Sequence, residues 1–155
     1  MANNIVKTEY DGLSLPYSPE AEQAVLGAII YEPECFGRVA EILTKPDFFH
    51  LSLHRTIYST MLSMFTQGLS IDFVTLYEEL KHEKNFDPTE GKTYLAALVE
   101  NCPSISNVEI YAKLVRDKFD IRQLIYAARR IMDEATANEL ESALLVDSAE
   151  PMIFD

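Results

Sequence analysis

Residues 91–93, near the middle of the chain, could belong to a nucleotide site. Gly91-Lys92-Thr93 matches the end of the phosphate-binding pattern G-x-x-x-x-G-K-[ST], in which backbone amides and the lysine hold phosphates. The first glycine of that pattern would fall where Phe86 stands, and phenylalanine disfavours the positive-φ turns that a close approach to phosphate needs. The preceding residues have a helical pattern, whereas a buried strand leads into such loops. We therefore interpret 86–93 as a loop that begins a helix, with Gly91 and Lys92 facing water.

Two histidines have the spacing of metal ligands. His50 and His54 stand four residues apart, as two zinc ligands would on one face of a helix. No third ligand accompanies them, and residues 51–53 hold no glutamate to act as a general base. We favour a polar surface, or a packed and hydrogen-bonded pair of His54 with Arg55 at a helix start. A metal-dependent enzyme is the lowest-ranked alternative.

Acidic residues are frequent, but their spacing does not suggest a catalytic pair. Glu78-Glu79 and Asp133-Glu134 occupy adjacent helical positions, so the two side chains of each pair point apart. Such runs are typical of a solvated face. No serine, cysteine or aspartate stands out as a nucleophile. The sequence predicts no catalytic, cofactor-binding or metal-binding residue in this chain.

Composition limits the class of protein. The 155 residues are 48% hydrophobic and 25% charged, which is typical of one ordinary globular domain. The N-terminus does not resemble a signal peptide, the apolar run 24–30 is too short to span a bilayer, and two isolated cysteines, Cys35 and Cys102, suggest free thiols in a cytoplasmic protein. The net charge of −12 opposes contact with phosphates. We expect no strong nucleic-acid binding and no membrane association.

The elements that would position any site are helical almost throughout, since no hairpin turn or alternating strand pattern occurs. Ser18 with Pro19, and later Asp72, suit helix starts, and Gly68 suits a helix end. The expected helices cover about 18–31, 32–43, 52–67 and 72–81, with a fifth from Thr89 or Glu90 towards Pro103. The apolar positions expected in their core are Ala21, Val25, Ala28, Ile29, Phe36, Val39, Ala40, Leu43, Ile57, Tyr58, Met61, Met64, Phe65, Leu76, Leu80, Tyr94, Leu95 and Leu98.

The last third of the chain differs from the rest. From Ser106 or Asn107 to about Ala135 neither glycine nor proline interrupts a helix of roughly 43 Å, which is too long for so small a protein to cover. A turn at 135–139, with Asn138 as a cap, leads to a second helix at about 139–150. The prediction is an all-α chain: a flexible tail (1–14), a compact multi-helix head (15–105) and a protruding antiparallel α-hairpin (106–155).

The first hairpin helix carries an apolar stripe at i, i+3, i+4 and i+7 spacing. It consists of Ile121, Leu124, Ile125, Ala128, Ile131, Met132 and Ala135. Packing against the return helix would account for part of the stripe. Phe119, Tyr126, Leu145 and Val146 lie off a single seam, and a two-helix layer has nothing to cover its other face. We therefore expect hairpins to pair with each other, around a two-fold axis.

Five segments in register resemble the N-terminal domain of bacterial replicative DNA helicases of the DnaB family. The resemblance covers residues 13–155 and places Gly91 in a family segment without a nucleotide role. The segments are LPYSPEAEQAVLGAII, DFFHLSLHRTIY, SIDFVTLYEEL, EGKTYLAALVENCPSISNVEIYAKLVRDK and LESALLVDSAEPMIFD. Two departures are the short ATANEL turn and Pro151, which we expect to break or kink a helix that relatives continue to the Ile-Phe pair.

The resemblance implies a function for the whole protein. Such helicases are hexameric rings that move along single-stranded DNA, with ATP and magnesium bound by a RecA-like motor domain after a linker, and this chain stops where that linker would begin. Their N-terminal domains pair through hairpins into a collar of three dimers that docks primase and possibly a helicase loader. The implied hairpin-interface residues are Ile121, Leu124, Ile125, Ala128 and Met132. The alternative is a stand-alone adaptor that binds a replicative helicase or primase. In either case we expect the isolated chain neither to hydrolyse ATP nor to bind single-stranded DNA appreciably at physiological salt.

Overall fold

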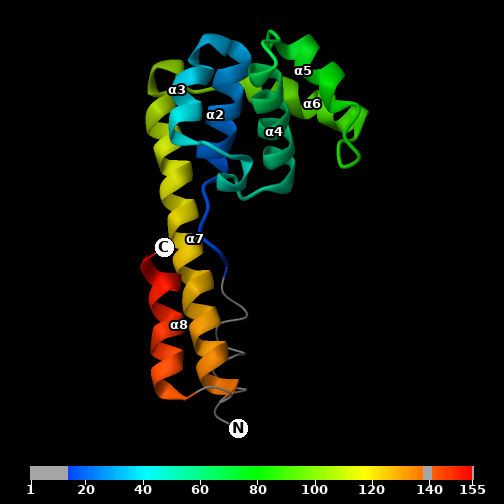
Figure 1. Cartoon of the computed structure of the whole chain (residues 1–155). Coiled ribbons are helices and arrows are strands. Elements are labelled where there is room, and N and C mark those ends of the chain that lie inside the picture. The colour runs from blue at the N-terminus through cyan, green and yellow to red at the C-terminus, as the bar shows by residue number, and fades with distance from the viewer. Residues whose placement is uncertain (1–13, 138–140, 155) are drawn as a thin grey trace. The chain divides into compact units, whose positions relative to one another are not determined.

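Every regular element in the residues that the structure describes is helical, which confirms the predicted all-α class (Figure 1). The computed structural model describes residues 14–137 and 141–154, so the predicted N-terminal tail lies almost wholly outside it. The chain divides into two compact units. One unit is Tyr17–Phe119, and the other combines the described residues before position 17 with those from Asp120 onward.

The first helix of the 17–119 unit, α2 (Pro19–Tyr31), begins as predicted. The Ser18 side chain accepts a hydrogen bond from the Ala21 N–H, and Pro19 occupies the first helical position. Helix α2 is buried on nearly all sides, well beyond the predicted stripe, because it packs against both α4 and α6. A short 3-10 turn, η1 (Pro33–Cys35), then leads into α3 (Phe36–Ile42).

Helix α4 (Ser52–Thr66) follows the 3-10 turn η2 (Pro46–Phe48) and ends before Gly68. Gly68 has a φ of 74°, a conformation that glycine adopts without strain, so the predicted helix end is confirmed. The prediction that Phe65 is buried was wrong. Its neighbour Met64 takes the inward position, and the exposed Phe65 ring packs 4.7 Å, between centroids, from the ring of Phe36.

Helices α5 (Phe73–Leu80) and α6 (Pro88–Glu100) complete the middle of this unit. Asp72 caps α5 as predicted, in a reciprocal capping box with Thr75. Helix α6 begins earlier than predicted, since the Asp87 side chain accepts from the N–H groups of residues 89 and 90 and Pro88 starts the helix. The short turn η3 (Ile105–Asn107) then precedes the long helix α7 (Val108–Ala137).

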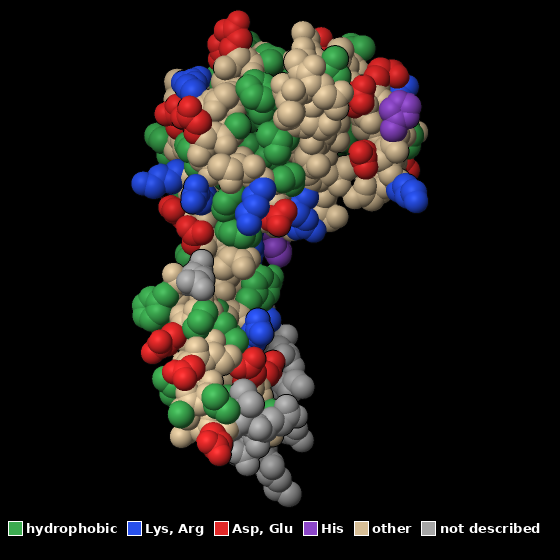
Figure 2. All heavy atoms as spheres, in the orientation of Figure 1, with side chains coloured by type: hydrophobic (Ala, Val, Ile, Leu, Met, Phe, Trp, Pro, Cys, Tyr) green, Lys and Arg blue, Asp and Glu red, His purple; other side chains and the backbone are tan. Residues whose placement is uncertain are grey.

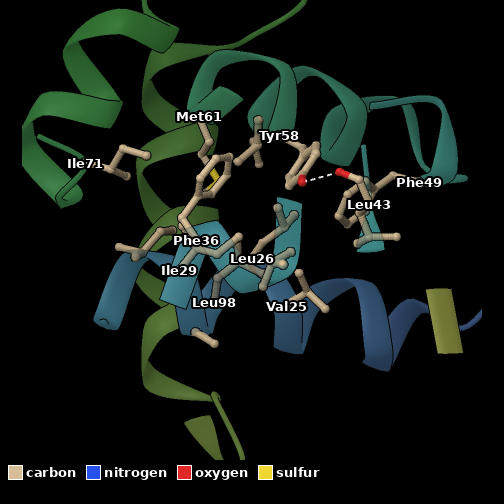
Figure 3. Packing of buried hydrophobic residues seen from close by; sticks show 14 of the residues in the cluster. Val25, Leu26, Ile29, Phe36, Leu43, Phe49, Tyr58, Met61, Ile71 and Leu98 are labelled. Atoms are coloured by element: carbon tan, nitrogen blue, oxygen red, sulfur yellow. Dashed lines mark hydrogen bonds between the residues drawn. The ribbon is translucent and has the colours of Figure 1, made fainter. Parts of the chain in front are cut away.

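Large side chains from α2, α3 and α4 converge in the core of the 17–119 unit (Figure 3). Within it the Tyr58 hydroxyl donates a hydrogen bond to the Leu43 carbonyl, and burial raises the pKa of Tyr58 well above its ordinary value. Gly27 allows α2 and α6 to approach closely, because a Cβ at this position would lie 2.2 Å from the Leu98 carbonyl oxygen. Val108, Ala112 and Val115 bring the start of α7 into the same core.

The second unit contains the later part of α7 and helix α8 (Ser142–Phe154), which lies alongside it and runs in the opposite direction (Figure 1). The Ser148 hydroxyl donates a 3.2 Å hydrogen bond to the Glu134 carboxylate across the two helices. At the other end, the buried Arg122 guanidinium donates a 3.0 Å hydrogen bond to the Pro16 carbonyl.

Helix boundaries in this unit differ from the prediction at three points. Helix α7 continues to Ala137, so the chain is still helical over the first part of the predicted turn, and Asn138 lies outside the described residues. Helix α8 begins at Ser142, later than predicted. The expectation that Pro151 breaks the helix was wrong, since α8 continues to Phe154. The missing N–H of Pro151 removes one backbone hydrogen bond without ending the helix.

Candidate functional site

The five predicted hairpin residues divide into an exposed and a half-buried group. Ile121 and Leu124 leave 44% and 57% of their surface exposed, and Ala128 is exposed as well. Ile125 and Met132 are half-buried. The five residues therefore differ in exposure, and Ile121, Leu124 and Ala128 are the ones whose side chains are most exposed to solvent.

The seam between α7 and α8 is formed by other residues. On α8 the half-buried residues have i, i+3, i+4 and i+7 spacing and are Leu145, Ser148, Ala149 and Met152. On α7 the half-buried residues on the side of the Ser148–Glu134 hydrogen bond are Ala127, Ile131 and Glu134. At about 100° per residue, Ile121, Leu124 and Ala128 fall within roughly 60° of one another, just beside this seam. Ile125 and Met132 lie further around α7, towards the side where Arg122 contacts Pro16.

Helix α8 adds apolar residues to the same side of the hairpin. Val146 and Ile153 are seven residues apart, share one helical face and leave 58% and 51% of their surface exposed. Since α8 is antiparallel to α7, their position beside the α8 seam brings them to the side that carries Ile121, Leu124 and Ala128. We call these five residues the hairpin face. In Figure 2 hydrophobic side chains reach the surface between acidic ones along α8.

The interface residues predicted from the sequence include neither Ile153 nor Val146. They all belong to the apolar stripe of the first hairpin helix, and Pro151 was expected to break the second helix before residue 153. The spacing of seven between two β-branched residues was the available signal.

The structure places Gly91-Lys92-Thr93 within the first turns of α6. The Gly91 N–H donates to the Asp87 carbonyl in the helix, and a Cβ on Gly91 would lie 2.3 Å from the Phe86 ring. The prediction that Gly91 faces water was therefore wrong, because the ring of Phe86 covers it. The Lys92 ammonium is exposed and lies 5.4 Å from the centroid of the Tyr77 ring.

His54 is packed and hydrogen-bonded, but its partners are Glu22 and Tyr94, whereas Arg55 had been expected. The ring Nδ1 lies 2.8 Å from Glu22 Oε1, and Nε2 lies 2.5 Å from the Tyr94 hydroxyl. Glu22 is also buried, and its carboxylate accepts the backbone N–H groups of His50 and Leu51. These bonds tie α2, α4 and α6 together.

The other candidate groups serve the fold or lie at the surface. The His50 ring packs on Tyr17, with 4.4 Å between centroids, and Arg55 donates to the carbonyls of Phe49 and His50. Among the described residues no group of three or more His, Cys, Asp or Glu side chains is arranged to hold a metal ion. Burial raises the pKa of the thiols of Cys35 and Cys102.

Neither acidic pair converges on a cleft. Glu78 pairs with Lys81 at 2.8 Å, and this hydrogen bond raises the pKa of the lysine, while Glu79 is exposed. Glu134 accepts from Arg130 at 3.4 Å.

Among the described residues, no helix combines the length and the apolar composition that crossing a membrane requires. The hairpin face is therefore the strongest candidate for a functional surface.

Comparison with known proteins identifies the chain's relatives. A family model described as the DnaB-like helicase N terminal domain matches residues 14–117. The chain is 36% identical over 144 residues to the replicative DNA helicase DnaB of Pasteurella multocida (strain Pm70), covering 92% of this chain and 31% of that protein. It is also 36% identical over 140 residues to the replicative DNA helicase DnaC of Bacillus subtilis (strain 168), covering 90% and 31%. The chain thus spans about a third of the length of these relatives.

Solved structures agree with this relationship. The crystal structure of the N-terminal domain of DnaB helicase from Mycobacterium tuberculosis has a TM-score of 0.84 at 29% identity, over 92% of this chain and 100% of that one. A DnaB-like replicative helicase, studied with its interactions with primase, has a TM-score of 0.71 at 26% identity, over 88% of this chain and 31% of that one. On its matched family model, its relatives and its fold, the chain belongs to the DnaB-like helicase N-terminal domain family.

Proposed function

We propose that this chain is the non-catalytic assembly and primase-docking domain of a hexameric, ATP-dependent replicative DNA helicase that acts in the cytoplasm. Its relatives are replicative helicases about three times its length. ATP and magnesium would be bound by a motor domain outside this chain. The observation that supports assembly is the hairpin face, which leaves large apolar side chains exposed on the described hairpin.

Self-pairing is the simplest way to cover the hairpin face. Fully burying one Leu, Ile or Val side chain contributes about 1.5–3 kcal/mol, and the four large residues of the hairpin face still expose about half of their surface. A two-fold axis would bury each of them once in each copy, which doubles the gain. Such dimers would be the units from which a hexamer forms, as a trimer of dimers.

Two substitutions with the same chemistry distinguish the hairpin face from the opposite side of α7. Ile121→Asp places a charge in the face, whereas Tyr126→Asp changes a residue with nearly the same exposure, 43% against 44%, on another side of the helix. We expect Ile121→Asp to raise the dimer dissociation constant at least about 30-fold and Tyr126→Asp to change it less than about threefold. Light scattering across a concentration series measures both.

A wild-type chain that stays monomeric at millimolar concentration would contradict the assembly role. Equal effects of the two substitutions would show that association uses a different surface. Circular dichroism of both variants verifies that neither has lost helix.

Support for primase docking comes from the solved relative whose title describes its interactions with primase. A docking site for a helicase loader on the same domain is a further part of this proposal. The negative charge of the chain favours protein partners over nucleic acid.

A further inference from the structure

The network of Glu22, His54 and Tyr94 joins a carboxylate, an imidazole and a phenol in a single line. Glu22 Oε1 lies 2.8 Å from His54 Nδ1, and His54 Nε2 lies 2.5 Å from the Tyr94 hydroxyl oxygen. The same order of groups, with serine in place of tyrosine, activates the nucleophile of serine hydrolases. The arrangement therefore has a chemical meaning besides its contribution to the fold.

The hydrogen bonds of Glu22 determine which way the protons point. One carboxylate oxygen accepts the N–H of His50 and the other accepts that of Leu51. An ionised carboxylate can only accept hydrogen bonds, so Nδ1 of His54 carries the hydrogen that Glu22 receives. In a neutral imidazole Nε2 is then an acceptor, and the Tyr94 hydroxyl donates to it. The phenol proton is thus directed at a base.

Burial separates the reacting end of the network from the rest. The side chains of Glu22 and His54 are buried, so water does not compete for the bond between them. Tyr94 is half-buried, and the exposed Gln23 donates a 3.4 Å hydrogen bond to its oxygen. Burial raises the pKa of Tyr94, so its phenol stays protonated at neutral pH and needs an adjacent base to act as a nucleophile.

We propose that Tyr94 is a covalent modification site that accepts an acyl group from an activated ester. The Tyr94 oxygen attacks the carbonyl carbon, and the phenol proton passes to His54 Nε2. The bond between the carbonyl carbon and the leaving-group oxygen breaks, and the leaving group departs as its anion. Glu22 is a positioning residue that stabilises the imidazolium, and the Gln23 amide supplies a donor for the negative charge that develops on the carbonyl oxygen.

Charge favours an acyl donor over a phosphoryl donor. A phosphoryl group brings several negative oxygens, which a chain with a net charge of −12 repels. Neither Gln23 nor Tyr94 offers a positive charge to neutralise them. An acyl carbon is uncharged, so its approach to Tyr94 carries no such penalty.

Acylation of Tyr94 would also weaken the packing of the 17–119 unit. The acylated oxygen has no hydrogen to donate, so the buried Nε2 of His54 loses its partner and the bond between α4 and α6 is lost. A covalent event at the surface would in this way reach the contact between helices. The proposal is independent of assembly, since no residue of the hairpin face takes part.

The test exposes the 155-residue chain to p-nitrophenyl acetate at pH 7. Mass spectrometry of proteolytic fragments measures the acetylation rate of each tyrosine. Tyr31 is the internal reference, because it is 65% exposed and no described imidazole accepts its hydroxyl. We expect Tyr94 to be acetylated at least about tenfold faster than Tyr31, although it is less exposed.

Two variants test whether His54 supplies the base. His54→Gln keeps a hydrogen-bond acceptor but cannot take up a proton, so it should slow acetylation of Tyr94 at least about tenfold and leave Tyr31 unchanged. Glu22→Gln removes the charge that stabilises the imidazolium and should slow it severalfold. His82→Gln, the same change at an exposed histidine, is the control and should alter neither rate.

Wild-type rates alone are enough to overturn the proposal. If Tyr94 reacts no faster than Tyr31, the network serves only the fold. If Tyr94 reacts faster but keeps its rate in His54→Gln and Glu22→Gln chains whose circular dichroism is unchanged, the imidazole is not the base and the proposal is again wrong. A variant that has unfolded is recognised because all its tyrosines react alike, and the other variant then decides.

Discussion

At the scale of single residues, Glu22, His54 and Tyr94 form a polar network in the interior, whose stability depends on complete hydrogen bonding. A buried carboxylate is costly unless it is fully hydrogen-bonded. Glu22 meets that condition with one imidazole nitrogen and two backbone N–H groups. The network joins three helices, with Glu22 on α2, His54 on α4 and Tyr94 on α6, so each helix depends on the placement of the other two.

We predict that His54→Ala lowers the free energy of unfolding by about 2–4 kcal/mol, because it leaves a buried carboxylate short of a partner and creates a cavity. Urea denaturation at pH 7 measures the change. His82→Ala, at an exposed histidine, is the matched control and should change stability by less than about 0.5 kcal/mol. Equal effects of the two substitutions would contradict the structural role of the network.

The sequence drew attention to His54 but not to its partner. His50 and His54 have the spacing of metal ligands, whereas Glu22 belongs to no such pattern. Glu22 lies 32 residues from His54, and no local pattern connects them. Side-chain pairs between distant helices form only after the helices pack, so spacing along one helix could not reveal this contact.

At the scale of the elements, two glycines differ sharply in what surrounds them. Gly27 lies where α2 crosses α6, against the Leu98 carbonyl, while Gly37 in α3 has no atom within 4 Å of the place where a Cβ would be. The first glycine is required by helix packing, and the second is not.

We predict that Gly27→Ala destabilises the chain by about 2–3 kcal/mol, because the added methyl group must separate the two backbones. Gly37→Ala should be neutral or stabilise by up to about 1 kcal/mol, since alanine favours a helix. Thermal unfolding followed by circular dichroism compares them. A melting temperature for Gly27→Ala at or above that of the wild type would show that α2 and α6 do not need this close approach.

Helix boundaries were predictable where a cap sets them. Ser18, Gly68 and Asp72 act through side-chain or backbone chemistry that is visible in a few adjacent residues. Pro151 shows the limit of such local rules, since one lost hydrogen bond did not outweigh the packing of α8 along α7. Phe65 shows another limit, because adjacent apolar residues on α4 compete for one inward position and only the packed neighbours decide between them.

At the scale of the whole molecule, charge and apolar surface act in opposite directions. The chain carries a net charge of −12, so two copies repel each other while the hairpin face favours their contact. The interface residues predicted from the sequence stay predictions until association is measured. The predicted boundaries of the head and the hairpin stay predictions as well.

We predict that raising NaCl at pH 7 strengthens self-association, because salt screens repulsion between like charges and leaves apolar burial intact. Sedimentation equilibrium at several salt concentrations measures this effect. Self-association that weakens with salt would indicate an interface held by ion pairs, which the hairpin face does not contain.

Helix α7 changes its surroundings along its length. Its first turns, at Val108, Ala112 and Val115, are enclosed by the core, whereas Ile121 and Leu124 have solvent on one side. The backbone amides of the early turns can therefore exchange with solvent only when the whole 17–119 unit opens, while those of the later turns need only local fraying. A partner bound to the hairpin face would slow exchange in the later turns alone, so one continuous helix would report on folding at one end and on assembly at the other.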